Sequence, residues 1–376
     1  MLAIINLTAA IVIASWPDRR ADLDTIRRWS ADWLRGRDIY AVQEAWPEYP
    51  PHAIVMLSPI AALSEDIAVP AWASFNLVLT IAASYLAVRM YDREATVSTA
   101  TLPMLMFLSW GGFRALLQFT LLSLVFGLLS VVVADRGPVW SGIFLGLGLM
   151  KPQVCIPFVL WAMLARRFRT LAIAVLVVGA GFLMYCLKVT SSPLQIAADY
   201  IAIVRRYYIG DAIVYGLAQP RPLFELLMSD TRIVDAVALT FAATTLAIVA
   251  AIGTAEGRRR HLLYAAPPLA ALWSLLTFYH LTYGFVILLP LAAVLLFESD
   301  PETVVARRWL FWVLQLSMMF DIPVLWRWFG HLLQAPGWVG EILIHADRSI
   351  IFTLFVCVAV LALRTCQTRR RSQTAL

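Results

Sequence analysis

The chain has 376 residues, of which 61% are hydrophobic and only 14% are charged. Soluble domains are usually about 45–50% apolar and about 25% charged, so this composition excludes an ordinary soluble enzyme and indicates a polytopic membrane protein. The net charge of +6 does not indicate nucleic-acid binding. Much of the arginine excess lies in short loops between apolar runs, where the positive-inside rule accounts for it.

The chain begins with an apolar run over residues 2–16 that lacks a basic n-region and a small-residue cleavage site, so we expect a retained first span. The first long polar passage follows at residues 18–52, and residues 22–35 within it have helical spacing. One stripe of this expected helix carries Leu23, Ile26, Ser30, Trp33 and Leu34. We expect the helix to lie in the membrane interface.

Further apolar runs predict an all-α bundle of about twelve spans that forms a single integral membrane domain over residues 1–376, since no linker rich in Ser, Gly or Pro divides them. The runs lie at about residues 69–90, 97–110, 116–134, 140–150, 152–165, 171–188, 233–253, 262–279, 281–297, 309–326 and 350–363. A shorter run, residues 53–63, cannot cross a bilayer, and we expect it to be re-entrant or interfacial.

Basic clusters set the expected orientation, because short loops rich in arginine stay in the cytoplasm. These clusters are Arg166/Arg167/Arg169, Arg258/Arg259/Arg260, Arg307/Arg308 and Arg369/Arg370/Arg371. Counting crossings between them places both chain termini in the cytoplasm and the loops 18–52 and 189–232 on the periplasmic or outer side. The segment around Gln118 and the turns at Lys151 and His280 fall on the same outer side. An extracytoplasmic active site is therefore expected.

The second outer loop, residues 189–232, is also partly amphipathic. Its apolar stripe consists of Leu194, Ala197, Tyr200, Ile201, Val204 and Tyr208. This pattern fits a helix that lies in the interface and caps the bundle. Arg205 and Arg206 beside the stripe fit, as an alternative, the binding of an anionic lipid headgroup.

Two aspartates in the first outer loop are the candidate catalytic groups. Asp22 and Asp24 lie two residues apart, so on a helix their side chains diverge; one can cap the helix while the other faces a cavity. Both also fit a plain structural role, as an N-cap or as salt-bridge partners of nearby arginines. A DxD pair is known from metal–nucleotide sites as well, but two acids in a charge-rich loop do not establish one.

Lys151 is a more specific signal, because it lies between two half-length apolar runs and is followed by Pro152, which prevents a continuous helix. A lysine at membrane depth costs roughly 2.5–3.5 kcal/mol on insertion scales, so it usually has a partner or faces water. A lipid-linked phosphate would be a natural partner. Snorkelling to the interface is the alternative.

Four further residues are candidates for substrate binding. His280 interrupts an apolar stretch, Arg221 lies between two prolines in a turn suited to phosphate, and Arg114 and Gln118 lie near an outer span end. Each also fits a packing or anchoring role. No metal site is expected. The four cysteines have no metal spacing and are expected to be reduced packing residues: Cys155, Cys186, Cys357 and Cys366.

Three stretches together resemble one family. The family's opening signature resembles DLDTIRRWSADWLRGRDIY followed by YPPHAIVMLSPIAAL. Its central segment is similar to GIFLGLGLMKPQVCIPFVLWAMLARRF. Its late histidine and the span that follows are similar to FYHLTYGFVILLPLAAVLL. The family is the GT-C superfamily of polyprenyl-phosphate-sugar-dependent glycosyltransferases, in particular the bacterial alpha-mannosyltransferase branch, glycosyltransferase family 87. The resemblance adds Tyr49 and His52 of the first signature to the expected substrate-binding residues.

The resemblance implies a GT-C-like membrane enzyme in the bacterial plasma membrane that moves a hexose, expected to be mannose, from polyprenyl phosphate to a glycan or glycolipid. Asp22 would be the general base of an inverting attack. Lys151, with Arg221 and His280, would bind the lipid phosphate and stabilise it as it leaves. No cofactor is expected, because a monophosphate held by cations needs no metal.

A transporter or lipid-linked-glycan flippase is the main alternative, since it too would hold polar groups inside a bundle. Transporters often consist of two similar halves, and no internal repeat is visible in this chain. A non-catalytic assembly subunit is a third possibility, which tolerance of substitutions at Asp22 and Asp24 would support.

Overall fold

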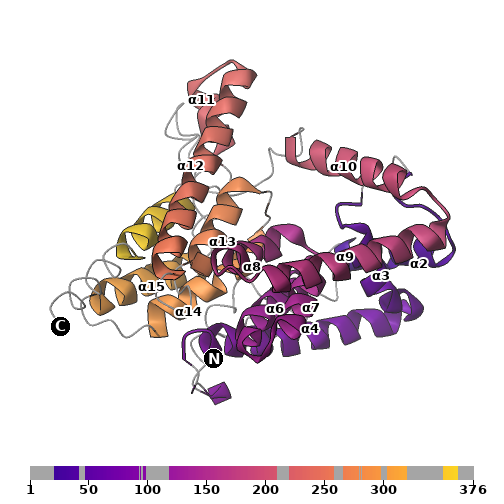
Figure 1. Cartoon of the computed structure of the whole chain (residues 1–376), viewed down its shortest axis with the longest axis horizontal. Helices are drawn as coiled ribbons and strands as arrows, with labels where there is room; N and C mark the ends of the chain where they lie inside the picture. The colour runs from indigo at the N-terminus through magenta and orange to yellow at the C-terminus, as the bar shows by residue number, and fades with distance from the viewer. Residues whose placement is uncertain are drawn as a thin grey trace.

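The computed structural model describes residues 21–41, 47–92, 94, 96–98, 118–209, 220–257, 266–278, 280, 282–297, 303–319 and 350–362. Every regular element in these ranges is helical and none is a strand (Figure 1), so the all-α class is confirmed. Several predicted features lie outside these ranges: the expected first span, most of the run at 97–110, Arg114, the arginines at 258–260 and 369–371, and both chain termini.

The helices follow one another along the chain with few residues between them. They are α2 (Ala21–Leu34), α3 (Pro51–Leu57), η2 (Ser58–Ala62), α4 (Glu65–Arg89), α6 (Thr120–Val132), η3 (Ala134–Arg136), α7 (Pro138–Gly148), α8 (Pro152–Leu164), α9 (Phe168–Val189), α10 (Pro193–Ile209), α11 (Arg221–Leu227), α12 (Thr231–Gly257), α13 (Ala266–Thr277), η5 (Thr282–Leu288), α14 (Leu289–Phe297), α15 (Val304–Met319) and a helix at Ile350–Ala362.

Three of the described helices are long and apolar enough to cross a membrane: α4, α9 and the part of α12 from Thr231 to Thr254. The other apolar helices in the described ranges are shorter, so the prediction of about twelve full spans is confirmed only in part. The reason is local, because Pro138 and Pro152 each begin a new helix and divide the apolar sequence into short segments. Multiple apolar helices still make this a membrane protein.

Helix α7 packs closely on α9 because two glycines leave room for the neighbouring helix. A Cβ atom added at Gly142 would lie 2.6 Å from Cβ of Ile173, and one at Gly146 would lie 2.7 Å from Cβ of Val177. Small residues at such contacts are typical of helix pairs in membranes. The opposite side of α9 exposes large apolar side chains, which suits contact with lipid.

Helix α2 forms where the sequence predicts it, and it buries most of the predicted stripe. Leu23, Ile26, Ser30 and Trp33 are buried as expected, whereas Leu34 is 43% exposed and Trp29 is buried as well. The apolar face packs against protein, on α3, η2 and α9. This contact with the body of the protein, in addition to the interface, decides which side chains point inward.

The predicted helix in the second outer loop is also present, as α10, and its predicted apolar stripe is only partly buried. Leu194 and Ile201 are exposed, whereas Ile196 is fully buried. Figure 1 shows α10 lying above α9 and α2, and Tyr200 touches the loop after α2 through the ring of Tyr40, with a centroid distance of 5.7 Å.

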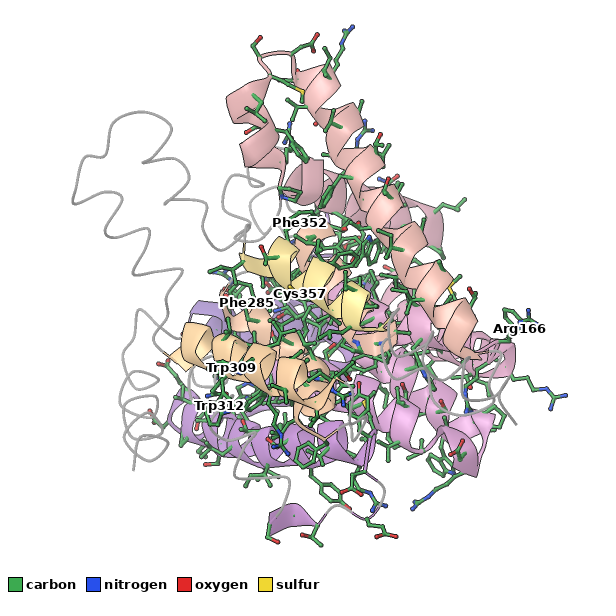
Figure 2. All side chains as sticks on the ribbon, turned by 90° about the vertical axis from the view of Figure 1, so that its left-hand side faces the viewer. Arg166, Phe285, Trp309, Trp312, Phe352 and Cys357 are labelled. Atoms are coloured by element: carbon green, nitrogen blue, oxygen red, sulfur yellow. The ribbon has the colours of Figure 1, made fainter. Side chains whose placement is uncertain are left out.

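The C-terminal half forms a second group of helices around α13. Figure 2 shows Trp309 and Trp312 on α15, near the helix at Ile350–Ala362 that carries Phe352. Both tryptophans are exposed, as expected for aromatic side chains that face lipid or headgroups. The ring of Phe352 packs against Phe241 of α12 with a centroid distance of 5.6 Å.

Candidate active site

The turn between α7 and α8 holds Lys151 inside the protein. Lys151 is the residue directly before α8, and its side chain is only 4% exposed. The hydroxyl of Ser123 in α6 donates to the carbonyl oxygens of Gly148 at 2.6 Å and Lys151 at 3.3 Å, which fixes the turn to α6. Gly148 must be small, because an added Cβ would lie 2.7 Å from Sγ of Cys155. The predicted break at Pro152 is therefore confirmed.

Tyr49, in the segment before α3, is a partner of Lys151. The ammonium Nζ donates to the Tyr49 hydroxyl at 3.3 Å and lies 5.4 Å from the centroid of its ring. Phe119 and Trp29 pack on the Tyr49 ring, with centroid distances of 6.0 and 6.4 Å. The hydroxyl of Tyr40 donates to the Tyr49 carbonyl at 2.6 Å. An aromatic wall of this kind stabilises a cation that has left bulk water.

Two carboxylates interact electrostatically with Lys151. Burial raises the pKa of Asp22 above its ordinary value, and the positive charge of Lys151 opposes this shift without cancelling it. Burial likewise raises the pKa of Glu48, where the charge of Lys151 opposes the shift and that of Asp22 adds to it. Residues from α2, the segment before α3 and the α7–α8 turn thus share one site. A carboxylate with a raised pKa is a stronger base than an ordinary one.

Asp24 lies differently from Asp22, as expected for residues two apart on a helix. Its Oδ1 atom is 3.7 Å from the guanidinium of Arg27, and that guanidinium donates to the carbonyl of Leu63 at 2.7 Å. This chain of contacts ties α2 to the end of η2. Of the two aspartates, Asp22 is the one that interacts electrostatically with Lys151, while Asp24 is held by Arg27.

His280 approaches the same site from the end of α13. It is 3% exposed, its Nε2 atom is 3.2 Å from the hydroxyl of Ser274, and it lies near enough to Lys151 to feel its charge. Ser274 donates in turn to the carbonyl of Gln153 at 2.6 Å, in the first turn of α8. These contacts link His280 to the helix that begins at Lys151.

His52 and Gln118 are buried polar residues that lie close in sequence to residues of the site. His52 is three residues beyond Tyr49 and packs against α9, where a Cβ added at Gly181 would lie 2.6 Å from its own Cβ. Gln118 directly precedes Phe119, whose ring touches Tyr49. Nε2 of His52 and Oε1 of Gln118 have no hydrogen-bond partner among the described residues. Buried polar atoms are usually paired, so both are available to a ligand.

Arg221 is not brought to Lys151. Its guanidinium forms ion pairs with Glu225 at 3.4 Å and Asp235 at 3.1 Å, within α11 and the start of α12. Figure 1 places these elements at the far end of an arm that extends away from α7 and α8. The phosphate role predicted for Arg221 finds no support in this arrangement. Arg114 lies outside the described residues.

Glu48 was missed by the reading of the sequence, which named its neighbour Tyr49. The first outer loop holds seven carboxylates, and nothing in their spacing distinguishes Glu48 from the others. Its only local signal is its position directly before the Tyr-Pro-Pro sequence. Within the described ranges, no group of three His, Cys, Asp or Glu side chains is placed to hold a metal ion.

Comparison with known families gives a match to glycosyltransferase family 87 over residues 46–205. No curated protein and no solved structure matches the chain. The matched range contains Glu48, Tyr49, His52 and Lys151, and it begins after Asp22. The family resemblance stated from the sequence is thereby confirmed. Residues 46–205 are therefore similar to glycosyltransferase family 87, a GT-C family of membrane glycosyltransferases.

Proposed function

We propose that the protein transfers a hexose, mannose, from a polyprenyl-phosphate donor to a hydroxyl group of a glycan or glycolipid, with inversion at the anomeric carbon. One observation carries the proposal: a buried ammonium, that of Lys151, is held by the Tyr49 hydroxyl and acts on the carboxylate of Asp22, in a chain that matches a glycosyltransferase family. An inverting transfer from a lipid phosphate needs this pair of charges, a base for the acceptor and a cation for the leaving group.

Lys151 binds the phosphate of the donor in this mechanism. Tyr49 and its aromatic neighbours orient the ammonium, and the burial of the site limits screening by water. As the bond between the sugar and the phosphate oxygen breaks, negative charge builds on that oxygen. A cation already in position stabilises this charge without having to reorganise.

Asp22 acts as the general base. Its carboxylate accepts the proton of the acceptor hydroxyl while the hydroxyl oxygen attacks the anomeric carbon from the side opposite the phosphate. The bond to the phosphate oxygen breaks, and polyprenyl phosphate leaves with the electron pair. Proton removal by a positioned carboxylate typically contributes about 10²–10⁴-fold to the rate.

His280, His52 and Gln118 complete the substrate-binding groups. His280 lies on the Lys151 side, where it can contact the phosphate or the sugar. His52 and Gln118 each carry a buried polar atom without a partner among the described residues, and hydroxyl groups of the sugar can satisfy such atoms. The substrates supply the only other components, since the proposal involves no cofactor.

The proposed site faces the extracytoplasmic side of a bacterial plasma membrane. Lys151 precedes α8, while Arg166 and Arg167 follow its C-terminal end. A helix of this length separates the two positions by roughly 20 Å at 1.5 Å per residue. Since arginine clusters stay in the cytoplasm, the Lys151 end points outward.

A transfer assay tests the proposal. The purified protein in lipid nanodiscs is given radiolabelled mannose on polyprenyl phosphate together with a lipid extract as acceptor. Covalent transfer is expected, with loss of activity in Asp22→Asn and retained activity in Asp24→Asn. Equal activity of Asp22→Asn and the unsubstituted protein would refute the role of Asp22. Uptake of label into sealed vesicles without covalent transfer would instead favour a transporter.

A further inference from the structure

The residue that holds the Lys151 ammonium, Tyr49, lies in a short segment, residues 47–49, that is not helical. Individual contacts, instead of a helical hydrogen-bond pattern, therefore set its position. Its hydroxyl accepts a hydrogen bond from Nζ of Lys151 at 3.3 Å, and its carbonyl oxygen accepts one from the Tyr40 hydroxyl at 2.6 Å. Tyr40 and Tyr49 are only 4% and 5% exposed. One buried residue thus joins Tyr40 to Lys151.

Tyr40 is itself fixed to a membrane-crossing helix, α9. The Oδ1 atom of Asp38 accepts hydrogen bonds from the Tyr40 backbone N–H at 3.1 Å and from the Tyr185 hydroxyl at 3.2 Å. The same Tyr185 hydroxyl accepts one from the backbone N–H of Ile39 at 3.1 Å. Tyr185 belongs to α9 and is fully buried. These three bonds hold residues 38–40 against α9.

Aromatic neighbours also set the orientation of the Tyr40 ring. Tyr185 of α9 and Tyr200 of α10 both meet it edge to face, with centroid distances of 5.3 and 5.7 Å. Edge-to-face pairs are a favoured geometry for aromatic rings. The rings make these contacts, so a phenylalanine at position 40 would keep them. The Tyr40 hydroxyl can therefore be removed on its own.

The bond from Tyr40 matters for Lys151 because the next bond in the series is long. A buried carbonyl that loses its donor is costly until it finds another partner, so the Tyr49 main chain is expected to turn when the Tyr40 hydroxyl is absent. The Tyr49 hydroxyl moves with its main chain. At 3.3 Å, its bond to Lys151 is already slightly beyond the usual range for nitrogen and oxygen. A small further shift breaks it.

We propose that Tyr40 is a positioning residue for the donor phosphate: its hydroxyl holds the Tyr49 main chain, and Tyr49 in turn directs the Lys151 ammonium toward the phosphate. This inference rests on the proposed function, because it needs a phosphate at Lys151. Tyr40 acts through Tyr49 and does not itself touch the substrate. The alternative is that the Tyr40 bond only stabilises the fold.

A binding experiment with a synthetic farnesyl-phosphate-mannose separates the two interpretations without depending on transfer. The affinity of this probe for the full-length protein in nanodiscs is measured for the unsubstituted protein, Tyr40→Phe, Tyr49→Phe and the double variant. Each single substitution should raise the dissociation constant about fivefold, the size expected for one hydrogen bond. The double variant should also show about fivefold, because Tyr40 has no further effect once the Tyr49 hydroxyl is absent. Two independent effects would instead multiply to about 25-fold.

Tyr85→Phe is the matched control, because it removes the hydroxyl of a half-buried tyrosine in α4 whose ring lies 5.8 Å from the guanidinium carbon of Arg89. It should leave the affinity unchanged. Thermal unfolding is recorded for every variant. If Tyr40→Phe does not fold, Tyr185→Phe replaces it, since it removes the hydroxyl that fixes Asp38 and Ile39. The expected rise is then about twofold, and it should vanish when Tyr49→Phe is also present.

Failure of the inference and failure of the proposed function give different results. If the probe binds through Lys151 but Tyr40→Phe has no effect, or its effect multiplies with that of Tyr49→Phe, Tyr40 is not a positioning residue and the proposed function stands. The same two results for Tyr185→Phe, where it replaces Tyr40→Phe, overturn the inference. If Lys151→Gln binds the probe as well as the unsubstituted protein, or neither binds it, both the donor assignment and the inference are overturned.

Discussion

Replacement of Lys151 by glutamine removes the cation from the site while keeping a polar side chain of similar length. Two unit charges about 4 Å apart attract each other by about 4 kcal/mol at an effective dielectric constant of about 20. Because Lys151 is only 4% exposed, screening by water is limited. An interaction of that size corresponds to about a thousandfold change in affinity. We expect Lys151→Gln to weaken binding of polyprenyl-phosphate mannose by up to this factor.

The assay compares the donor dissociation constant and kcat/KM of Lys151→Gln with those of Lys188→Gln. Lys188 is the other lysine of the chain, and it is exposed in the last turn of α9. Thermal unfolding is followed for both variants, because loss of Lys151 leaves Asp22 and Glu48 without their cation. A folded Lys151→Gln protein with unchanged donor affinity would refute the phosphate role and favour the snorkelling interpretation.

The remaining predictions follow from single contacts. Tyr49→Phe removes the oxygen that accepts the ammonium hydrogen bond, worth about 1 kcal/mol, so donor KM should rise about fivefold with little change in kcat. Gly146→Ala should lower the unfolding free energy by about 1–3 kcal/mol through overpacking, whereas Gly179→Ala, which meets nothing within 4 Å, should be neutral or stabilising in a thermal-unfolding assay. Arg221→Gln should leave donor KM unchanged, since its partners are carboxylates; a large rise in KM would contradict this placement. Transfer should fall on acidification with a midpoint above 3.8, the ordinary value for an aspartate, because the pKa of Asp22 is raised. The folded state holds that proton more tightly than the unfolded chain, so protonation of Asp22 itself does not destabilise the fold. The pH–rate profile tests the base assignment, and a midpoint at or below the ordinary aspartate value would contradict it.

The helices were predictable where local signals are strong. Periodic apolar residues predicted α2 and α10, and Pro152 predicted the break that places Lys151 in a turn. The inward faces were predictable only in part. Leu34 and Leu194 fit their stripes by spacing, yet both are exposed. Periodicity shows that a helix has an apolar side, whereas the packing partners decide which residues of that side are covered by protein.

The site was predictable as far as isolated charges in apolar surroundings reveal it. Lys151 stands out because an ammonium at membrane depth is costly, and the same reasoning singled out His280. Glu48 lies in a loop crowded with carboxylates, so no local property distinguished it. The phosphate role predicted for Arg221 rested on its flanking prolines, whereas the structure pairs its guanidinium with Asp235, fourteen residues further along the chain.

A structure of the Asp22→Asn variant with polyprenyl-phosphate mannose and an acceptor bound tests the central claim most directly. The substitution removes the base and allows the donor to remain intact in the site. The account predicts that a phosphate oxygen lies within hydrogen-bonding distance of Nζ of Lys151, with the acceptor hydroxyl beside the side chain at position 22. A donor phosphate bound at Arg221, or in any place beyond the reach of Lys151, would contradict it.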